Sequence, residues 1–179
     1  MNEKIVIAVD AMGGENSPNK IIDGIKLVLK DNSNLYFNLF GKSDQINDLI
    51  SSNDLLNEKC QIINSELVIN DNESPLQAAK KNDKSSMWQA INSVKNKESQ
   101  IALSAGNTGA LLILSKMILE MIEGIDKPAL AGLWPNKKGM NIVLDLGANI
   151  ECSDKNLIDF TYMGSSLYKS LFPELMPKI

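Results

Sequence analysis

Arginine and histidine are both absent from this 179-residue sequence, so every basic side chain is a lysine. The lack of histidine excludes serine–histidine and cysteine–histidine catalytic pairs as well as histidine metal sites. The lack of arginine excludes an arginine finger. If the protein binds a phosphate, backbone N–H groups and the side chains of lysine, serine, threonine and asparagine must hold it.

Cysteine is scarce as well, with only Cys60 and Cys152 in the chain. Neither belongs to a CxxC pair, so no disulfide framework is expected and we interpret both as reduced thiols of a cytoplasmic protein. A signal peptide is not expected, because the first strand begins within a few residues of Met1.

Long hydrophobic runs and an excess of positive charge are also missing. The longest apolar stretch, 110–122, is interrupted by Lys116 and Glu120 and is too short to span a bilayer, so we predict a helix buried on most sides. The net charge of −4 and the pI of about 4.9 argue against nucleic-acid binding, which normally needs a basic surface.

A glycine loop at 104–109 is the most informative feature that is present. The short apolar strand 101–103 leads into Ser-Ala-Gly-Asn-Thr-Gly, and a helix begins at once. Glycines allow a ligand to approach the backbone, and the first turn of a helix presents N–H groups and a positive dipole end to an anion. The loop therefore predicts a phosphate site, although Gly106 and Gly109 taken alone could form only a tight turn.

Two further strand ends carry glycine. The buried strand 4–9 leads to Asp10, Gly13 and Gly14, after which Ser17 and Pro18 are expected to begin a helix. The strand 141–146 contains Asp145 near its end, and Gly147 and Asn149 follow it. Neither loop matches a GxGxxG or GxxxxGK[ST] motif, so a standard dinucleotide or P-loop site is not supported.

Strands and helices alternate along the whole chain, which predicts one α/β domain, residues 1–179, with a largely parallel sheet. The remaining strands are expected at 35–40, 60–63 and 129–134, and the last helix at 153–172. In a parallel sheet the loops after the strands share the carboxyl edge, where ligands bind. We therefore expect all three glycine loops to face one crevice.

A lysine cluster is predicted on the helix that Ser74 and Pro75 begin. Lys80, Lys81 and Lys84 follow one another at helical spacing and would share a side. Such a cluster is either a solvated face or a basic patch for an acidic partner.

The chain resembles the PlsX family of phosphate acyltransferases. The resemblance rests on motifs that occur in order along the chain: DAMGGENSP at 10–18, SSM at 85–87, SAGNTGALL at 104–112, GIDKPAL at 124–130, VLDLGANIEC at 143–152 and YMGSSLY at 162–168. It covers the N-terminal half of the family's chain. Lysines stand here where the family often has arginine before SSM.

The resemblance implies a three-layer α/β/α sandwich similar to isopropylmalate dehydrogenases and phosphotransacetylases. It also implies transfer of a fatty acyl group from acyl carrier protein to inorganic phosphate, which gives acyl phosphate for phospholipid synthesis. Family members are cytosolic homodimers that associate peripherally with the membrane, and no cofactor or metal is expected.

Phosphate is already largely a dianion at neutral pH and attacks a thioester without a general base, so the lack of histidine does not exclude this reaction. The protein must position the reactants and stabilise the oxyanion. We predict that Asn107 and Asn149 are catalytic, with Asn149 donating to the thioester oxygen. Lys80, Lys81 and Lys84 are predicted to contact the carrier protein. The predicted phosphate- and substrate-binding residues are Asp10, Gly13, Gly14, Ser104, Gly106, Thr108, Gly109, Asp145 and Gly147. Asp10 and Asp145 are expected to orient loop amides more than to touch phosphate.

Three alternatives to this hypothesis exist. One is a truncated α/β domain that folds or dimerises without turnover. A dehydrogenase of the same fold would need arginine and an acidic metal cluster, which this sequence lacks. RNA binding through the GNTG sequence at 106–109 fits poorly with the strand before it and with the acidic charge balance.

Overall fold

The computed structural model describes residues 3–80, 84–137 and 139–179. The chain forms two compact units, residues 1–119 and 120–179, and each unit is described by itself. Whether both belong to the one domain expected from the sequence stays a prediction.

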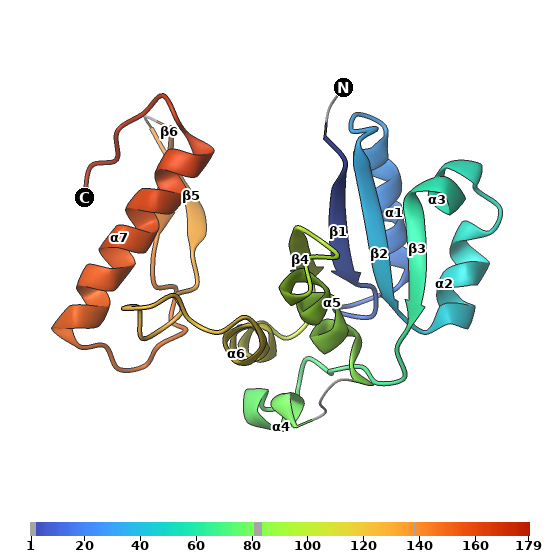
Figure 1. The fold of residues 1–179 in the computed structure, drawn as a ribbon, viewed down its shortest axis with the longest axis horizontal. Helices are drawn as coiled ribbons and strands as arrows, with labels where there is room; N and C mark the ends of the chain where they lie inside the picture. The colour runs from blue at the N-terminus through green and yellow to red at the C-terminus, as the bar shows by residue number, and fades with distance from the viewer. Residues whose placement is uncertain (1–2, 81–83, 138) are drawn as a thin grey trace. The chain divides into compact units, whose positions relative to one another are not determined.

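The first unit is built on a four-stranded parallel sheet (Figure 1). Its strands lie in the order β3-β2-β1-β4, and all three neighbouring pairs are parallel. Their bounds are β1 Ile5–Asp10, β2 Leu35–Gly41, β3 Cys60–Asn64 and β4 Ile101–Ser104. The predicted α/β class with a largely parallel sheet is confirmed.

Helices cover both faces of this sheet. The helices are α1 Asn19–Leu29, α2 Ser43–Ile50, α3 Asp54–Lys59, α4 Pro75–Ala79, α5 Ser86–Lys95 and α6 Thr108–Leu119. On one face α1, α2 and α3 pack against Val9, Phe37 and Leu39 of the strands. On the other face Ala90 of α5 packs against Ala8 and Phe40. These layers agree with the expected three-layer arrangement.

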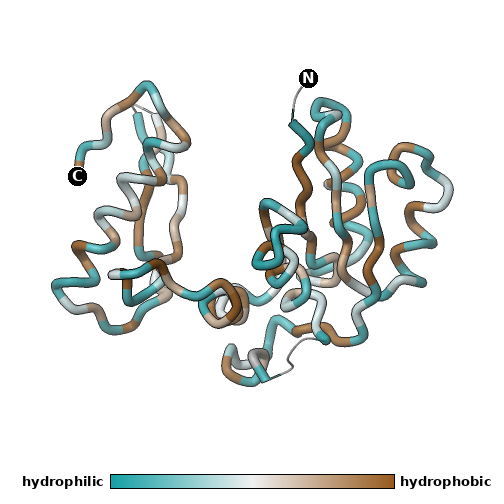
Figure 2. Tube along the Cα trace, in the orientation of Figure 1, coloured by the Kyte–Doolittle hydropathy of each residue, from teal (hydrophilic) through white to brown (hydrophobic). Residues whose placement is uncertain are grey.

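A second core joins α4, α5 and α6. Its buried side chains include Ala78, Met87, Ile91 and Leu114, with Ala102 of β4 packed against them. The hydrophobic colouring in Figure 2 runs along the central strands and along α6. The apolar run that the sequence predicts as a buried helix thus forms α6, although only part of its surface is covered.

The strand register brings the first two glycine loops together. Asp10, the last residue of β1, is the partner of Ser104, the last residue of β4. Because the two strands are parallel, the loops that follow them leave the sheet at the same edge. The convergence predicted for these two loops is confirmed.

Two local predictions for this unit were wrong. One helix was expected from Ser74 onward, but the structure has two, α4 and α5. The second helix begins anew because Ser85 caps it by accepting a hydrogen bond from the N–H of Trp88. Ser17 does not cap α1, because its hydroxyl donates to the carbonyl oxygen of Gly13 instead. This bond folds the first glycine loop back on itself.

The second unit contains an antiparallel hairpin and one long helix. The hairpin strands are β5 Gly132–Asn136 and β6 Gly139–Val143, and the helix is α7 Asp154–Leu171. The sequence suggested parallel strands here, and this was wrong because two strands joined by a tight turn must run antiparallel. The third glycine loop therefore follows a hairpin strand and not a strand of the parallel sheet.

Helix α7 begins where its sequence predicts. Ser153 and Asn156 form a reciprocal capping box at its start. A Cβ added at Gly164 would lie 3.0 Å from Leu144 Cδ1, so the glycine allows close packing of the helix on the segment after β6. Among the described residues, no helix has the length and apolar character that crossing a membrane requires.

Both cysteines are free thiols. Burial raises the pKa of the Cys60 thiol to about 11, whereas the side chain of Cys152 is exposed. Cys60 therefore carries little thiolate at neutral pH and serves as a packing residue at the start of β3.

Candidate functional site

The first part of the candidate site is a polar link between the ends of β1 and β4. The hydroxyl of Ser104 donates to Asp10 Oδ2 at 2.7 Å and accepts from the N–H of Gly106 at 3.1 Å. The other carboxylate oxygen of Asp10 accepts from the N–H of Met12 at 3.3 Å. One buried carboxylate thus holds both glycine loops.

Asp10 is only 2% exposed. Burial raises its pKa above the ordinary value, and the hydroxyls of Ser86 and Ser104 with the N–H groups of Met12 and Gly13 partly oppose this rise. Through these contacts Asp10 orients N–H groups of the loop that follows it. A direct contact between Asp10 and phosphate stays a prediction.

The two loops touch at glycine. A Cβ added at Gly13 would lie 2.6 Å from Asp10 Oδ2, 2.8 Å from Ser104 Oγ and 2.9 Å from the backbone nitrogen of Gly106. Gly14 has a φ of +85° and lies against the carbonyl oxygen of Ala105, where a Cβ would come within 2.6 Å. Both positions therefore require glycine, one for close approach and one also for its backbone conformation.

Asn107 shapes the start of α6. Its Oδ1 accepts from the N–H of Ala110 at 2.9 Å, and its Nδ2 donates to the carbonyl oxygens of Glu73 at 2.8 Å and Asp71 at 3.1 Å. The side chain thus caps the helix and fixes the loop 70–74 beside it. A catalytic contact of Asn107 stays a prediction, and here its amide is used within the protein.

The N–H groups of Thr108 and Gly109 belong to the first turn of α6. The first backbone hydrogen bond of the helix is the one in which the N–H of Leu111 donates to the carbonyl oxygen of Asn107. N–H groups ahead of that bond have no partner within the helix and point along its positive dipole end. They are suitable donors for an anion.

A pocket of about 440 Å³ opens above these groups, and it contains residues that the sequence analysis identified together with one that it missed. Its lining residues are Gly14, Glu15, Lys20, Asp71, Ala105, Gly106, Asn107 and Thr108. Lys20 is the basic side chain among them and lies in the first turn of α1. An exposed lysine carries no sequence signal of its own, but its position one turn behind the first glycine loop could have suggested it.

Charge in this pocket is mixed. Lys20 and the helix start of α6 favour an anion, whereas Glu15 and Asp71 oppose it. The pocket therefore fits a small anion held close to the backbone donors and the lysine, away from the two carboxylates.

The third glycine loop forms a separate polar cluster within the second unit. Asp145 Oδ1 accepts from the N–H of Leu130 at 2.8 Å, and Oδ2 accepts from the N–H of Asn149 at 2.7 Å. Burial alone would raise the pKa of Asp145, but these hydrogen bonds lower it below the ordinary value. Gly147 in the same loop has a φ of +79°.

The side chain of Asn149 is also engaged. Its Nδ2 donates to the carbonyl oxygen of Pro128 at 2.8 Å and to Asp145 Oδ2 at 3.0 Å. Donation to a thioester oxygen would require one of these bonds to open. The catalytic role of Asn149, and a shared crevice for all three loops, stay predictions.

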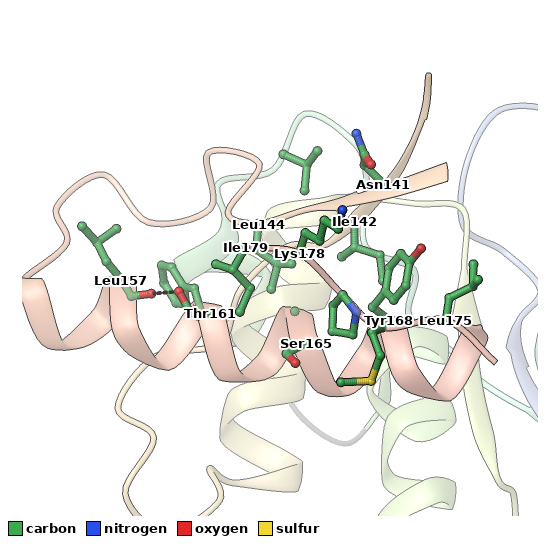
Figure 3. A pocket seen from close by; sticks show the side chains of 15 residues that line it. Asn141, Ile142, Leu144, Leu157, Thr161, Ser165, Tyr168, Leu175, Lys178 and Ile179 are labelled. Carbon is green, nitrogen blue, oxygen red and sulfur yellow. Dashed lines mark hydrogen bonds between the residues drawn. The ribbon is translucent and has the colours of Figure 1, made fainter. Parts of the chain in front are cut away.

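A larger pocket of about 850 Å³ lies in the second unit between β6, α7 and the last residues of the chain. Figure 3 shows apolar side chains such as Ile142, Leu144 and Leu175 around it, with Tyr168 and Thr161 from α7. The hydroxyl of Thr161 donates to the carbonyl oxygen of Leu157. This lining is suited to apolar groups and not to a phosphate.

The predicted lysine cluster does not share a helix face. Lys80 follows the last residue of α4, and Lys84 directly precedes Ser85, the cap of α5. Lys81 lies outside the described residues. The spacing argument was wrong because the segment is not one continuous helix, but both described lysines lie on the connection that follows the carboxyl end of β3.

Metal ligands do not gather in the part of the chain that the structure describes, where no group of three or more acidic or cysteine side chains could hold an ion.

Comparison with known proteins finds one matching family model and several relatives that share one name. A family model described as "Fatty acid synthesis protein" matches residues 5–179. The phosphate acyltransferase of Pelagibacter ubique is 56% identical over 179 residues, which is 100% of this chain and 53% of the relative. That of Rhodospirillum rubrum is 41% identical over 164 residues, 92% of this chain and 47% of the relative. The chain spans about half the length of the curated relatives it matches.

Proposed function

The chain belongs to the fatty acid synthesis protein family, and from this premise we propose that it takes part in the transfer of a fatty acyl group from acyl carrier protein to inorganic phosphate. The product would be acyl phosphate for phospholipid synthesis. The relatives named phosphate acyltransferase support the reaction class. The observation that carries the proposal is the pocket between two glycine loops and the start of α6, beside Lys20.

The proposed step needs no histidine. A phosphate oxygen attacks the thioester carbonyl carbon, the carbon–sulfur bond breaks, and the carrier leaves as a thiolate that takes up a proton from water. The N–H groups of Thr108 and Gly109 and the ammonium of Lys20 hold the phosphate in position to attack the carbonyl carbon. Asn149 is the proposed donor to the thioester oxygen, in exchange for one of its present acceptors.

Release of carrier thiol that depends on phosphate is the direct test. Purified chain is mixed with acyl carrier protein thioester, and free thiol is followed with and without inorganic phosphate, with sulfate as the control anion. The exposed thiol of Cys152 contributes a background that does not depend on phosphate. Equal release in phosphate and in sulfate would contradict the proposed activity.

The second candidate is a domain that binds phosphate or dimerises without turnover. It is favoured by one observation, namely that the chain spans about half of its relatives. Phosphate binding without thiol release would support it over catalysis. Homodimerisation and peripheral membrane association, which the family resemblance implies, stay predictions.

Replacement of Lys20 by alanine is expected to weaken binding of inorganic phosphate about threefold to tenfold, since a partly solvated charge contact contributes about 1 kcal/mol. Titration calorimetry at low and high salt measures the effect, which should shrink as salt screens the charge. Lys30→Ala is the matched control, because Lys30 lies at the other end of α1. Equal losses in both variants would show a general charge effect and remove Lys20 from the site.

Reversal of charge at Lys80 and Lys84 is expected to weaken binding of acyl carrier protein, because the carrier is acidic. Affinity should fall about tenfold for the double glutamate variant at about 0.05 M salt and less at about 0.5 M salt. A Lys30→Glu Lys97→Glu double variant has the same net charge on residues that precede strands. If it lowers affinity equally, Lys80 and Lys84 are merely solvated.

A further inference from the structure

Two carboxylates line the loop pocket beside the donors that suit an anion. Glu15 directly follows Gly14 of the first glycine loop, and Asp71 lies on the loop 70–74. Both residues are exposed. Within the described part of the chain, neither carboxylate has a hydrogen-bond or ion-pair partner, and neither pairs with Lys20, which lines the same pocket. Their oxygens are therefore available to a ligand in the pocket.

Asp71 is held at the pocket by the hydrogen bonds of its own loop. Asn107 Nδ2 donates to the backbone carbonyl oxygen of Asp71 at 3.1 Å. On either side of Asp71, Glu73 Oε1 accepts from the backbone N–H and from the side-chain amide of Asn70, both at 2.9 Å. The N–H of Glu73 in turn donates to the carbonyl oxygen of Asn70. This turn keeps a negative charge beside the start of α6, where the anion donors lie.

A protonated anion changes the effect of these carboxylates. The phosphate dianion keeps one O–H group at neutral pH and the monoanion keeps two, whereas sulfate has none. An ionised carboxylate only accepts hydrogen bonds, and a bond from an O–H group to a carboxylate is one of the stronger kinds. The carboxylates repel the unprotonated oxygens of either anion, but phosphate alone can offer them a donor.

We propose that Glu15 and Asp71 make the loop pocket selective for a protonated oxyanion, because they accept the O–H group of bound phosphate and repel anions that lack one. This inference rests on the phosphate site of the proposed function. The N–H groups of Thr108 and Gly109 and the ammonium of Lys20 bind unprotonated oxygens. With its O–H group turned to the carboxylates, phosphate keeps an unprotonated oxygen, which is the better nucleophile, for the thioester carbon.

The ratio of the affinities for phosphate and for unprotonated anions tests the inference. The chain is titrated in a calorimeter with sodium phosphate, sulfate and fluorophosphate at equal ionic strength in the presence of EDTA. A site that hydrogen-bonds a hydroxyl of its ligand rejects analogues without it, and for these exposed carboxylates we expect about tenfold to 100-fold weaker sulfate binding. Fluorophosphate has the charge of the phosphate dianion but fluorine in place of the O–H group, so it should bind as weakly as sulfate.

The double variant Glu15→Gln Asp71→Asn should bind sulfate within about threefold of phosphate, because an amide accepts from a phosphate O–H group and also donates to a sulfate oxygen. The matched control is Glu3→Gln Asp48→Asn, which removes the same charge from two exposed residues that do not line the pocket. It should keep the ratio of the unaltered chain. Loss of negative charge alone strengthens the binding of phosphate and fluorophosphate dianions alike, so only lost acceptors change their ratio.

Four results would overturn the inference. Equal affinity of the unaltered chain for phosphate and fluorophosphate would leave the phosphate site in place and remove its selectivity for the O–H group. An unchanged ratio in the double variant would remove Glu15 and Asp71 from that selectivity. Phosphate binding that requires Mg²⁺ in place of EDTA would mean that the carboxylates hold a cation. Failure to bind any of the three anions would contradict the phosphate site of the proposed function itself.

Discussion

Replacement of Gly13 by alanine is expected to weaken phosphate binding in the loop pocket and to destabilise unit 1. The added Cβ would lie within 2.6 to 2.9 Å of Asp10 Oδ2, Ser104 Oγ and the nitrogen of Gly106. None of these atoms belongs to a long flexible side chain, and Asp10 is buried. The loops must therefore separate, at a cost of about 1–3 kcal/mol, as for other overpacked sites.

The same substitution should also lower the affinity for phosphate. Movement of Gly106 breaks its bond to Ser104 and displaces the backbone that leads into the helix start. Because each 1.4 kcal/mol corresponds to about a tenfold change in affinity, we expect binding to weaken about tenfold or more. Calorimetry with inorganic phosphate measures the affinity, and urea unfolding measures the stability.

Gly24→Ala is the matched control. Gly24 lies in α1, and a Cβ there would meet nothing within 4 Å. Alanine in a helix interior is favoured over glycine by about 0.5–1 kcal/mol, so this variant should be more stable and bind phosphate normally. Normal phosphate binding by Gly13→Ala would mean that the contact between the two loops does not shape the site.

The parts of the fold that the sequence predicts well are those with strong local patterns. The buried run before Asp10 and the short apolar run before Ser104 were predicted as strands, and their parallel pairing follows from the helices between them. The cap at Ser153 and the stop near Phe172 define α7. These signals depend on neighbours in the chain, so they can be read without the structure.

The parts that the sequence misses depend on contacts between distant residues. Nothing near Asn107 indicates that its amide reaches Asp71 and Glu73, and nothing near Asn149 indicates Pro128. The hairpin of β5 and β6 was missed because two apolar runs fit the expected alternation of strands and helices as well as they fit a hairpin. Lys20 was missed because only the folded loops make it part of a pocket.

Replacement of Asn107 by alanine is the second substitution with a large expected effect. It removes the acceptor for the N–H of Ala110 and the donor to the carbonyl oxygens of Glu73 and Asp71. Loss of a helix cap costs about 1 kcal/mol, and each of the two lost hydrogen bonds costs about 0.5–1.5 kcal/mol, so a total of about 2–4 kcal/mol is expected. Urea unfolding measures this loss.

The substitution should also weaken function, even where the variant is fully folded. The start of α6 and the loop 70–74 both form the pocket, and without the amide they are no longer held together. We expect phosphate affinity and any phosphate-dependent thiol release to fall about tenfold or more under conditions in which the variant is fully folded. Asn107→Ser separates the two roles, because serine retains a cap acceptor but is too short to bind both carbonyl groups.

Asn53→Ala provides the matched control for the cap. Asn53 caps α3 by accepting from the N–H of Leu56 at 3.1 Å, and it does not line the loop pocket. It should lose about 1 kcal/mol of stability and no phosphate affinity. If Asn107→Ala behaves like Asn53→Ala, or if Asn107→Ser restores phosphate binding fully, Asn107 is only a helix cap. If Asn107→Ala loses phosphate affinity and Asn107→Ser does not restore it fully, the hydrogen bonds between Asn107 and the loop 70–74 keep the anion donors in place.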